Sequence, residues 1–239
     1  MADAKRGPRL TTGRLILWPA IITLALTLLR LVGDLKRWPM PWFNSAAGGA
    51  GALVGIVWLP LILGPYFAFR VRFEIISPHS MGKWVGYAVL GLAVSLAGLL
   101  ASRAPGMTPL TRLAVPVLGL ALGAAIQYAV WPELIKVLLA YGYAARIPVV
   151  VVAFLAMRYN WATHYNASPP FLPEMSFWPK FFLAVVFPQL VGWVGYTVVA
   201  GSMTGAFASG LLRRHPSEEV HSAGQFSVIS SQSSEGVKK

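Results

Sequence analysis

The sequence predicts an all-α membrane protein in which about six transmembrane helices form a bundle. Hydrophobic residues make up 56% of the 239 residues and charged residues only 12%, whereas a soluble domain carries roughly 25% charged residues. So little charge cannot cover a surface in contact with water. The apolar residues also occur in long blocks, and a helix needs about 20 apolar residues to cross the hydrocarbon core.

The apolar blocks set the predicted boundaries of the transmembrane domain, residues 15–212. The basic segment 1–14 precedes the first block, and charges rather than a cleavage site follow it, so we predict an uncleaved first span. The last block stays apolar to residue 212, which is too long for one upright helix, so we expect it to tilt, to kink at Pro188 or to continue past the bilayer. The six spans are predicted over residues 15–32, 50–69, 84–101, 113–131, 134–157 and 181–201.

A short connection separates the fourth and fifth predicted spans. It consists of Trp131-Pro132-Glu133, and proline is well tolerated in the first turn of a helix. We therefore predict a tight turn that opens the fifth helix. The alternative is one long interrupted element, which would leave five spans and move the C-terminus to the other side of the membrane.

Orientation is predicted from the positive-inside rule. The net charge is +12, and most cations lie at the ends of apolar blocks, so we expect a lipid partner and no nucleic acid. With the N-terminus inside, the inner side would hold Lys5, Arg6, Arg9, Arg14, Arg70, Arg72, Lys83, Lys136, Arg213 and Arg214. The outer side would hold Arg30, Lys36, Arg37, Arg103, Arg112, Arg158 and Lys180. This bias favours cytoplasmic N- and C-termini. We expect a bacterial inner membrane because the chain is short and carries neither a cleaved signal nor an organelle address. Residues 213–239 are Ser-rich with almost no large apolar residues, which predicts a disordered tail.

One polar residue stands out within a predicted span. Arg146 lies near the middle of the fifth apolar block, and Tyr143 precedes it by three residues on the same helix. Gln127 and Gln189 lie inside other predicted spans and could face the guanidinium. These four residues form a candidate site for an anion or a polar head group. The alternative is an arginine that reaches the interface or binds carbonyl groups near Pro148.

The second candidate region is the loop that follows the fifth span. Residues 158–180 combine prolines with aromatic residues, which predicts an ordered loop lying on the membrane surface. The loop residues of interest are Arg158, Trp161, His164, Tyr165 and Glu174. His164 and Glu174 are an acid–base pair in principle. The alternative is a loop with a purely structural role.

Several chemistries lack the residues that they require. The chain contains no cysteine, so thiolate metal sites are excluded. Carboxylates are placed outside the predicted spans, with Asp34, Glu74 and Glu174 in loops and Glu133 at the start of the fifth span. This pattern argues against a carboxylate proton relay and a divalent-cation site. No catalytic or cofactor motif is present, and we expect no cofactor and no catalytic residues.

Two further patterns bear on function. Trp84-Val85-Gly86-Tyr87 recurs as Trp193-Val194-Gly195-Tyr196, which would fit an inverted repeat of three spans, as in many carriers, or a chance match. Pairs of glycines four residues apart, as at Gly201 and Gly205, favour close helix packing within the bundle or an oligomer.

Three functions follow as hypotheses. The first is a non-enzymatic accessory or scaffold subunit of a membrane complex, because no motif for chemistry is found. The second is a small-solute or anion carrier or channel with a polar path around Arg146. The third is an intramembrane lipid-modifying enzyme that uses the 158–180 loop and depends on His164.

Overall fold

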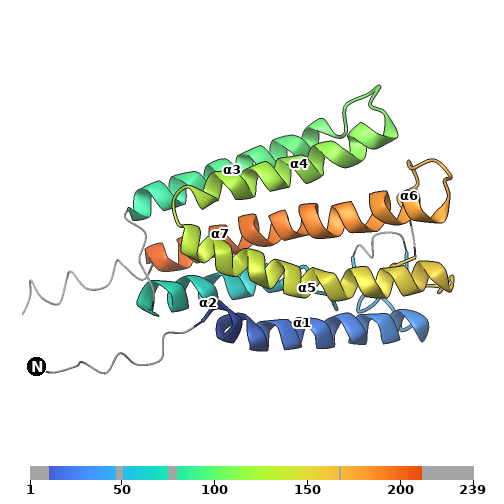
Figure 1. The fold of residues 1–239 in the computed structure, drawn as a ribbon, viewed down its shortest axis with the longest axis horizontal. Helices are drawn as coiled ribbons and strands as arrows, with labels where there is room; N and C mark the ends of the chain where they lie inside the picture. The colour runs from blue at the N-terminus through green and yellow to red at the C-terminus, as the bar shows by residue number, and fades with distance from the viewer. Residues whose placement is uncertain (1–10, 47–50, 75–79, 167, 212–239) are drawn as a thin grey trace, which may run out of the picture.

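The computed structural model describes residues 11–46, 51–74, 80–166 and 168–211. Within these ranges the protein is helical and contains no strand, which confirms the predicted all-α fold (Figure 1). Most of the basic segment 1–14 and all of the predicted Ser-rich tail lie outside the described residues.

The described part of the chain is a succession of helices. Their bounds are α1 Thr12–Leu35, α2 Leu59–Glu74, α3 Met81–Ala101, α4 Pro109–Tyr128, α5 Pro132–Arg158, α6 Phe177–Phe181 and α7 Val194–Leu211, with the π-helical segments η2 Phe182–Val186 and η3 Pro188–Trp193 between the last two. Five helices in the described part are long and apolar enough to cross a membrane: α1, α3, α4, α5 and the continuous run from α6 to α7. These are the predicted spans with the exception of the second.

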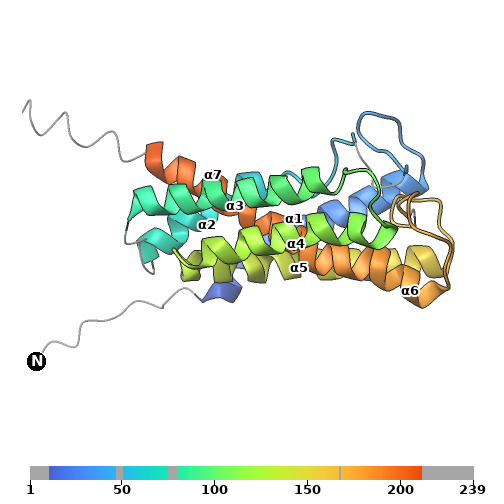
Figure 2. The same ribbon diagram turned by 90° about the horizontal axis from the view of Figure 1, so that it is seen from above.

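The helices run side by side along the long axis of the molecule (Figures 1 and 2). The hairpin of α3 and α4 lies along one edge in Figure 1, and α1 lies along the opposite edge. Helix α7 is the centre of the bundle, because it packs against α2, α3, α4 and α5. The start of α1 and the end of α7 lie at the same end of the bundle (Figure 1).

The buried face of α1 is polar and its exposed face is apolar, the reverse of a surface helix in a soluble protein. Its buried face carries Thr23, Thr27, Arg30 and Asp34. Its exposed face carries Leu17, Ile21, Ile22, Leu24, Leu28, Leu29 and Val32. A surface helix in water has the opposite arrangement. An apolar exterior around a polar interior is suited to lipid, so the chain is an integral membrane protein.

The second predicted span, residues 50–69, is wrong in its start. The helix begins only at Leu59 and continues to Glu74, so α2 has 16 residues and a length of about 24 Å, which is less than the hydrocarbon core of about 30 Å. Residues 51–58 form no regular helix. Non-helical backbone at membrane depth is tolerated only where the protein satisfies its polar groups. Here Arg30 Nη1 donates to the Val54 carbonyl at 2.6 Å and the Tyr196 hydroxyl donates to the Val57 carbonyl at 3.1 Å.

The predicted turn at Trp131-Pro132-Glu133 is confirmed. Helix α4 ends at Tyr128, and Pro132 opens α5 in its first turn. Trp131 is buried at the turn and meets Trp84 edge to face, with ring centroids 4.7 Å apart. The alternative of one interrupted element is therefore excluded by two separate helices.

Glycines bring several helices into backbone contact. A Cβ atom added at Gly119 would lie 3.1 Å from the Cα atom of Gly98, so α4 and α3 touch at these two positions. A Cβ atom at Gly64 would overlap the Gly201 carbonyl oxygen, so α2 and α7 also touch. The predicted packing role of Gly201 and Gly205 within the bundle is confirmed, since a Cβ atom at Gly205 would lie 2.8 Å from the Cβ atom of Ala68.

The two halves of the chain differ in structure at the positions of the suggested repeat. The second helix of the first half has 16 residues, whereas its counterpart α5 has 27. Trp84 lies in the first turn of α3, whereas Trp193 ends the π-helical segment η3 before α7.

Candidate functional site

Arg146 lies inside the bundle on α5. The residue is only 5% exposed, so its side chain does not reach the bundle surface. Its Nη1 atom donates to the Gln189 Oε1 atom at 3.3 Å. Its Nε atom is buried and has no hydrogen-bond partner. A buried guanidinium with an unsatisfied N–H is costly in a membrane interior, and such residues commonly mark a functional site.

A π-helical segment forms the wall opposite Arg146. Gln189 lies in η3, which begins at Pro188, and Trp193 ends the same segment. The central carbon of the guanidinium lies 4.7 Å from the centroid of a Trp193 ring, which is the geometry of a cation–π contact. π-helical segments occur preferentially at functional sites, because the wider turn changes which side chains share a face. Here Gln189 and Trp193 both face Arg146.

Tyrosine hydroxyls surround the guanidinium at a longer range. Tyr141, Tyr165 and Tyr196 all lie within electrostatic range of Arg146. The Tyr141 hydroxyl lies 2.8 Å from the Thr23 hydroxyl, and Thr23 donates its one hydrogen to the Pro19 carbonyl at 2.7 Å. Tyr141 must therefore donate to Thr23.

The charge of Arg146 is not balanced by a carboxylate in the part of the chain that the structure describes. Asp34, a buried carboxylate of the described residues, forms an ion pair with Arg30 and a hydrogen bond with His164. The surroundings of Arg146 are instead an amide oxygen, an indole face and phenol groups. This arrangement leaves a net positive charge that an anion could neutralise.

The other two residues of the predicted polar site lie elsewhere. Gln127 is 1% exposed and lies between α4 and α3, where its Nε2 atom donates to the Ala88 carbonyl at 3.5 Å. Tyr143 is 44% exposed and lies on the lipid-facing side of α5. The structure thus brings Gln189 to Arg146, but neither Gln127 nor Tyr143.

A second polar cluster joins α1 to the loop after α5. Asp34 was expected in a loop, but it lies in the last turn of α1 and is 2% exposed. Its carboxylate accepts hydrogen bonds from Arg30 Nε at 3.2 Å and from the backbone N–H of His164 at 3.2 Å. The same carboxylate also contacts the Nδ1 atom of His164. Arg30 further donates to the Asn44 carbonyl at 2.7 Å, so its guanidinium holds three segments together.

The 158–180 loop folds back over the end of α1. The Tyr165 hydroxyl donates to the Thr27 carbonyl at 3.3 Å, and its ring lies 3.9 Å from that of His164. Burial, with a smaller effect of the nearby Asp34 carboxylate, raises the pKa of Tyr165 above its ordinary value. Of the predicted acid–base pair, His164 is hydrogen-bonded to Asp34, whereas Glu174 is exposed.

The remaining loop residues singled out from the sequence lie at the surface or against other aromatics. Arg158 is exposed at the end of α5. Trp161 stacks on Tyr159 with ring centroids 6.3 Å apart. No group of three His, Asp or Glu residues that could hold a metal ion occurs within the described residues.

Two site residues escaped the sequence analysis. Asp34 was predicted in a loop, although its spacing from Thr23, Thr27 and Arg30 by alternating steps of four and three residues puts all four on one helix face. Trp193 was considered only as part of a repeat, although it lies four residues after Gln189. A search for polar stripes within apolar blocks would have found the first signal.

No protein-family model, curated protein or solved structure matches this chain significantly. The fold and the two polar clusters define a class, an α-helical membrane protein with charged residues in its interior.

Proposed function

We propose that this membrane protein binds a small anion at Arg146 and acts as an anion carrier or channel. The observation that carries the proposal is the buried guanidinium, which has an unpartnered Nε atom and no carboxylate partner in the described part of the chain. An anion would supply both the missing acceptor and the missing charge. A charge-assisted hydrogen bond of this kind is about twice as strong as a neutral one.

The irregular segment 51–58, which is linked to Arg146 through Tyr196, supports the same proposal. Carriers often bind substrates where transmembrane helices are broken near the middle of the bilayer. Tyr196 links the two features here, because it lies within electrostatic range of Arg146 and donates to the Val57 carbonyl in the irregular segment 51–58. The N-terminus of α2 follows directly at Leu59, and a helix N-terminus favours negative charge.

The cation–π contact offers a way to release the anion. Trp193 holds the guanidinium in place when no anion is bound, without forming the fixed charge pair that a carboxylate would form. An anion then competes with an indole face rather than with a salt bridge. Weak binding of this kind allows the bound anion to leave, which conduction requires.

We further propose that the protein lies in a bacterial inner membrane with both termini in the cytoplasm. The excess of cations on that side in the predicted topology supports this orientation. The accessory-subunit hypothesis, drawn from the absence of motifs, stays a prediction that no contact in the structure favours. The lipid-modifying enzyme also stays a prediction, with His164 bonded to Asp34 rather than to Glu174.

Anion flux from proteoliposomes tests the proposed function. Purified protein is reconstituted and the efflux of chloride, acetate and inorganic phosphate is followed separately. Arg146→Ala should reduce efflux to the level of empty vesicles, while Arg146→Lys should keep part of it because the charge remains. Tyr143→Phe is the matched control, since it changes a lipid-facing residue one turn away on the same helix. Unchanged efflux in a folded Arg146→Ala protein would refute the proposal.

A further inference from the structure

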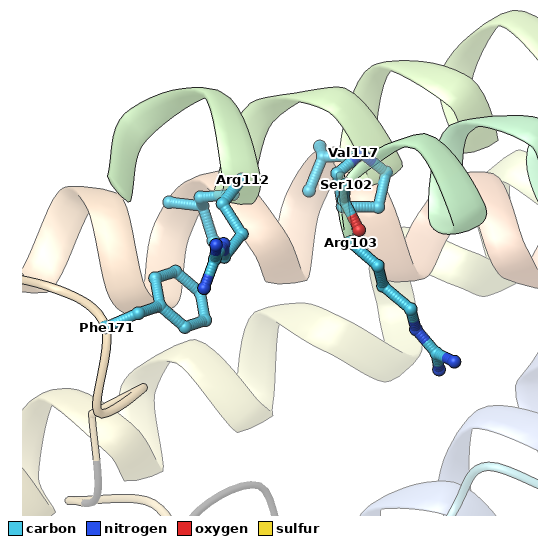
Figure 3. Close-up of a pocket in the computed structure, with 7 residues that line it drawn as sticks. Ser102, Arg103, Arg112, Val117 and Phe171 are labelled. Atoms are coloured by element: carbon cyan, nitrogen blue, oxygen red, sulfur yellow. The ribbon is translucent and has the colours of Figure 1, made fainter. Parts of the chain in front are cut away.

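A second candidate site lies at the surface of the bundle, where the α3–α4 hairpin meets the loop after α5. A pocket of about 470 Å³ opens there, lined by residues from the end of α3, the start of α4 and the loop. Figure 3 shows Arg112 and Phe171 on one side of the pocket and Arg103 on the other. The pocket is separate from the Arg146 site, with which it shares no residue.

Two arginines and no carboxylate line this pocket. Arg112 points toward Phe171 (Figure 3), and its central guanidinium carbon lies 6.0 Å from the ring centroid. Its Nε atom is buried and has no hydrogen-bond partner, so the pocket contains an unused donor. Arg103 is exposed, which leaves its guanidinium accessible from the membrane surface. The planar guanidinium group of arginine carries N–H donors in a geometry that matches the oxygen atoms of a phosphate group.

The rest of the lining is apolar. Leu113, Pro116 and Val117 lie along the first turns of α4 and continue from the arginines toward the interior of the bundle. A pocket that is positive at its mouth and apolar along its wall matches a molecule with an anionic head and a hydrocarbon chain. A small free anion would form no favourable contact with the apolar wall.

The position of the pocket along the bundle also fits a ligand with an anionic head and a hydrocarbon chain. The pocket lies where α3 ends at Ala101 and α4 begins at Pro109, so it is at the end of two predicted spans. Exposed Tyr159 follows the last residue of α5 and exposed Trp178 lies in α6. The end of α5 and α6 lie at the same end of the bundle as the connection between α3 and α4 (Figure 1). Tyrosine and tryptophan prefer the head-group layer of a bilayer. The two arginines are therefore at the level of lipid phosphates.

We propose that this pocket binds one anionic phospholipid. Arg112 holds the head-group phosphate with its unpartnered Nε–H group, Arg103 adds positive charge at the opposite rim, and the first acyl-chain carbons lie along Leu113, Pro116 and Val117. Phe171 packs against the Arg112 guanidinium and keeps it directed into the pocket. The proposal does not depend on anion binding at Arg146.

Spin-labelled lipids test this site in the intact protein. The protein is reconstituted in phosphatidylcholine bilayers that contain a trace of spin-labelled phosphatidylglycerol or, separately, spin-labelled phosphatidylcholine. The wild type should immobilise phosphatidylglycerol preferentially. Arg112→Gln should weaken this preference by about tenfold, because a hydrogen bond to a charged group is lost. Arg158→Gln is the control, since it removes one exposed positive charge at the same end of the bundle outside the pocket.

Two further arms keep the test decisive. Arg103→Glu reverses an exposed charge that folding does not require, so its loss of preference would support the site even if Arg112→Gln fails to fold. Competition with inorganic phosphate separates a lipid site from a phosphate site. Displacement of the labelled lipid by inorganic phosphate at low concentration would overturn the lipid assignment. Equal immobilisation of the two lipids by the wild type, or an unchanged preference in Arg103→Glu, would also overturn it.

Discussion

His164 and Asp34 lie 130 positions apart in the chain and are joined by two contacts. The backbone N–H of His164 donates to the Asp34 carboxylate at 3.2 Å, and the Nδ1 atom of its ring contacts the same oxygen. Asp34 also accepts from Arg30, so one buried carboxylate ties the loop after α5 to α1. The loop is thereby fixed over the bundle.

Asp34→Asn should destabilise the protein strongly. The substitution keeps the shape of the side chain but leaves the buried Arg30 without its counterion, which costs about 3 kcal/mol of the free energy of unfolding. Unfolding by a denaturing detergent in mixed micelles measures the change. Glu174→Gln is the control, because it neutralises an exposed carboxylate, and its effect should be within about 0.5 kcal/mol. Equal effects of the two substitutions would show that Asp34 does not form the structural pair described here.

Gly64→Ala should disrupt the contact between α2 and α7. The added methyl group would overlap the carbonyl oxygen of Gly201, which is backbone and cannot rotate away. We expect a loss of about 2 kcal/mol from overpacking. Gly86→Ala in α3 is the matched control, because nothing lies within 4 Å of the added atom, and the higher helix propensity of alanine makes it neutral or slightly stabilising. Thermal unfolding in detergent compares the two variants, and a Gly64→Ala protein as stable as Gly86→Ala would contradict the packing.

The raised pKa of Tyr165 predicts a loss of stability at alkaline pH. Burial and then Asp34 favour the neutral phenol, so above the ordinary pKa of 10.0 the folded state keeps a proton that the unfolded state has released. The free energy of unfolding therefore falls as the pH rises beyond that value. Tyr165→Phe should fall less steeply over the same range, as measured by unfolding at a series of pH values. Parallel curves for the two proteins would contradict this environment for Tyr165.

The absence of cysteine makes the topology directly testable. Single cysteines at Ala2 and Ser222 should react with a membrane-impermeant maleimide from the same side of the membrane. A single cysteine at Ala104, in the α3–α4 connection, should react from the other side. Labelling of Ala2→Cys and Ser222→Cys from opposite sides would show an odd number of crossings and contradict the proposed topology.

The sequence predicts the fold class well because the hydrophobic blocks are unambiguous. Residues 84–101 and 134–157 fall within the observed α3 and α5, and the turn at Pro132 follows from the preference of proline for the first turn of a helix. The prediction of the second span has the wrong start because hydropathy measures only apolar content. The stretch from Gly51 to Leu59 is as apolar as a transmembrane helix, but two of its backbone carbonyl groups accept hydrogen bonds from Arg30 and Tyr196 of other helices. Such tertiary hydrogen bonds are invisible in a single sequence.

The candidate site was predictable only in part. The position of Arg146 within an apolar block identifies it as unusual, and Gln189 is one of two glutamines that could have faced it. Choosing between Gln189 and Gln127 requires the helix arrangement. Trp193 could not be chosen either, because the π-helical segment changes the face on which residues after Pro188 lie.

Anion binding at Arg146 is tested most directly by the dependence of thermal stability on added anions. The melting temperature is measured against chloride, acetate and inorganic phosphate at constant ionic strength, in a background carrying Arg112→Gln so that the surface pocket does not contribute. Binding to the folded state alone stabilises it by about 2.7 kcal/mol at a hundredfold excess over the dissociation constant. At least one anion should raise the melting temperature of the parent, and Arg146→Gln should abolish that rise. An equal rise in the Arg146→Gln protein would contradict the account.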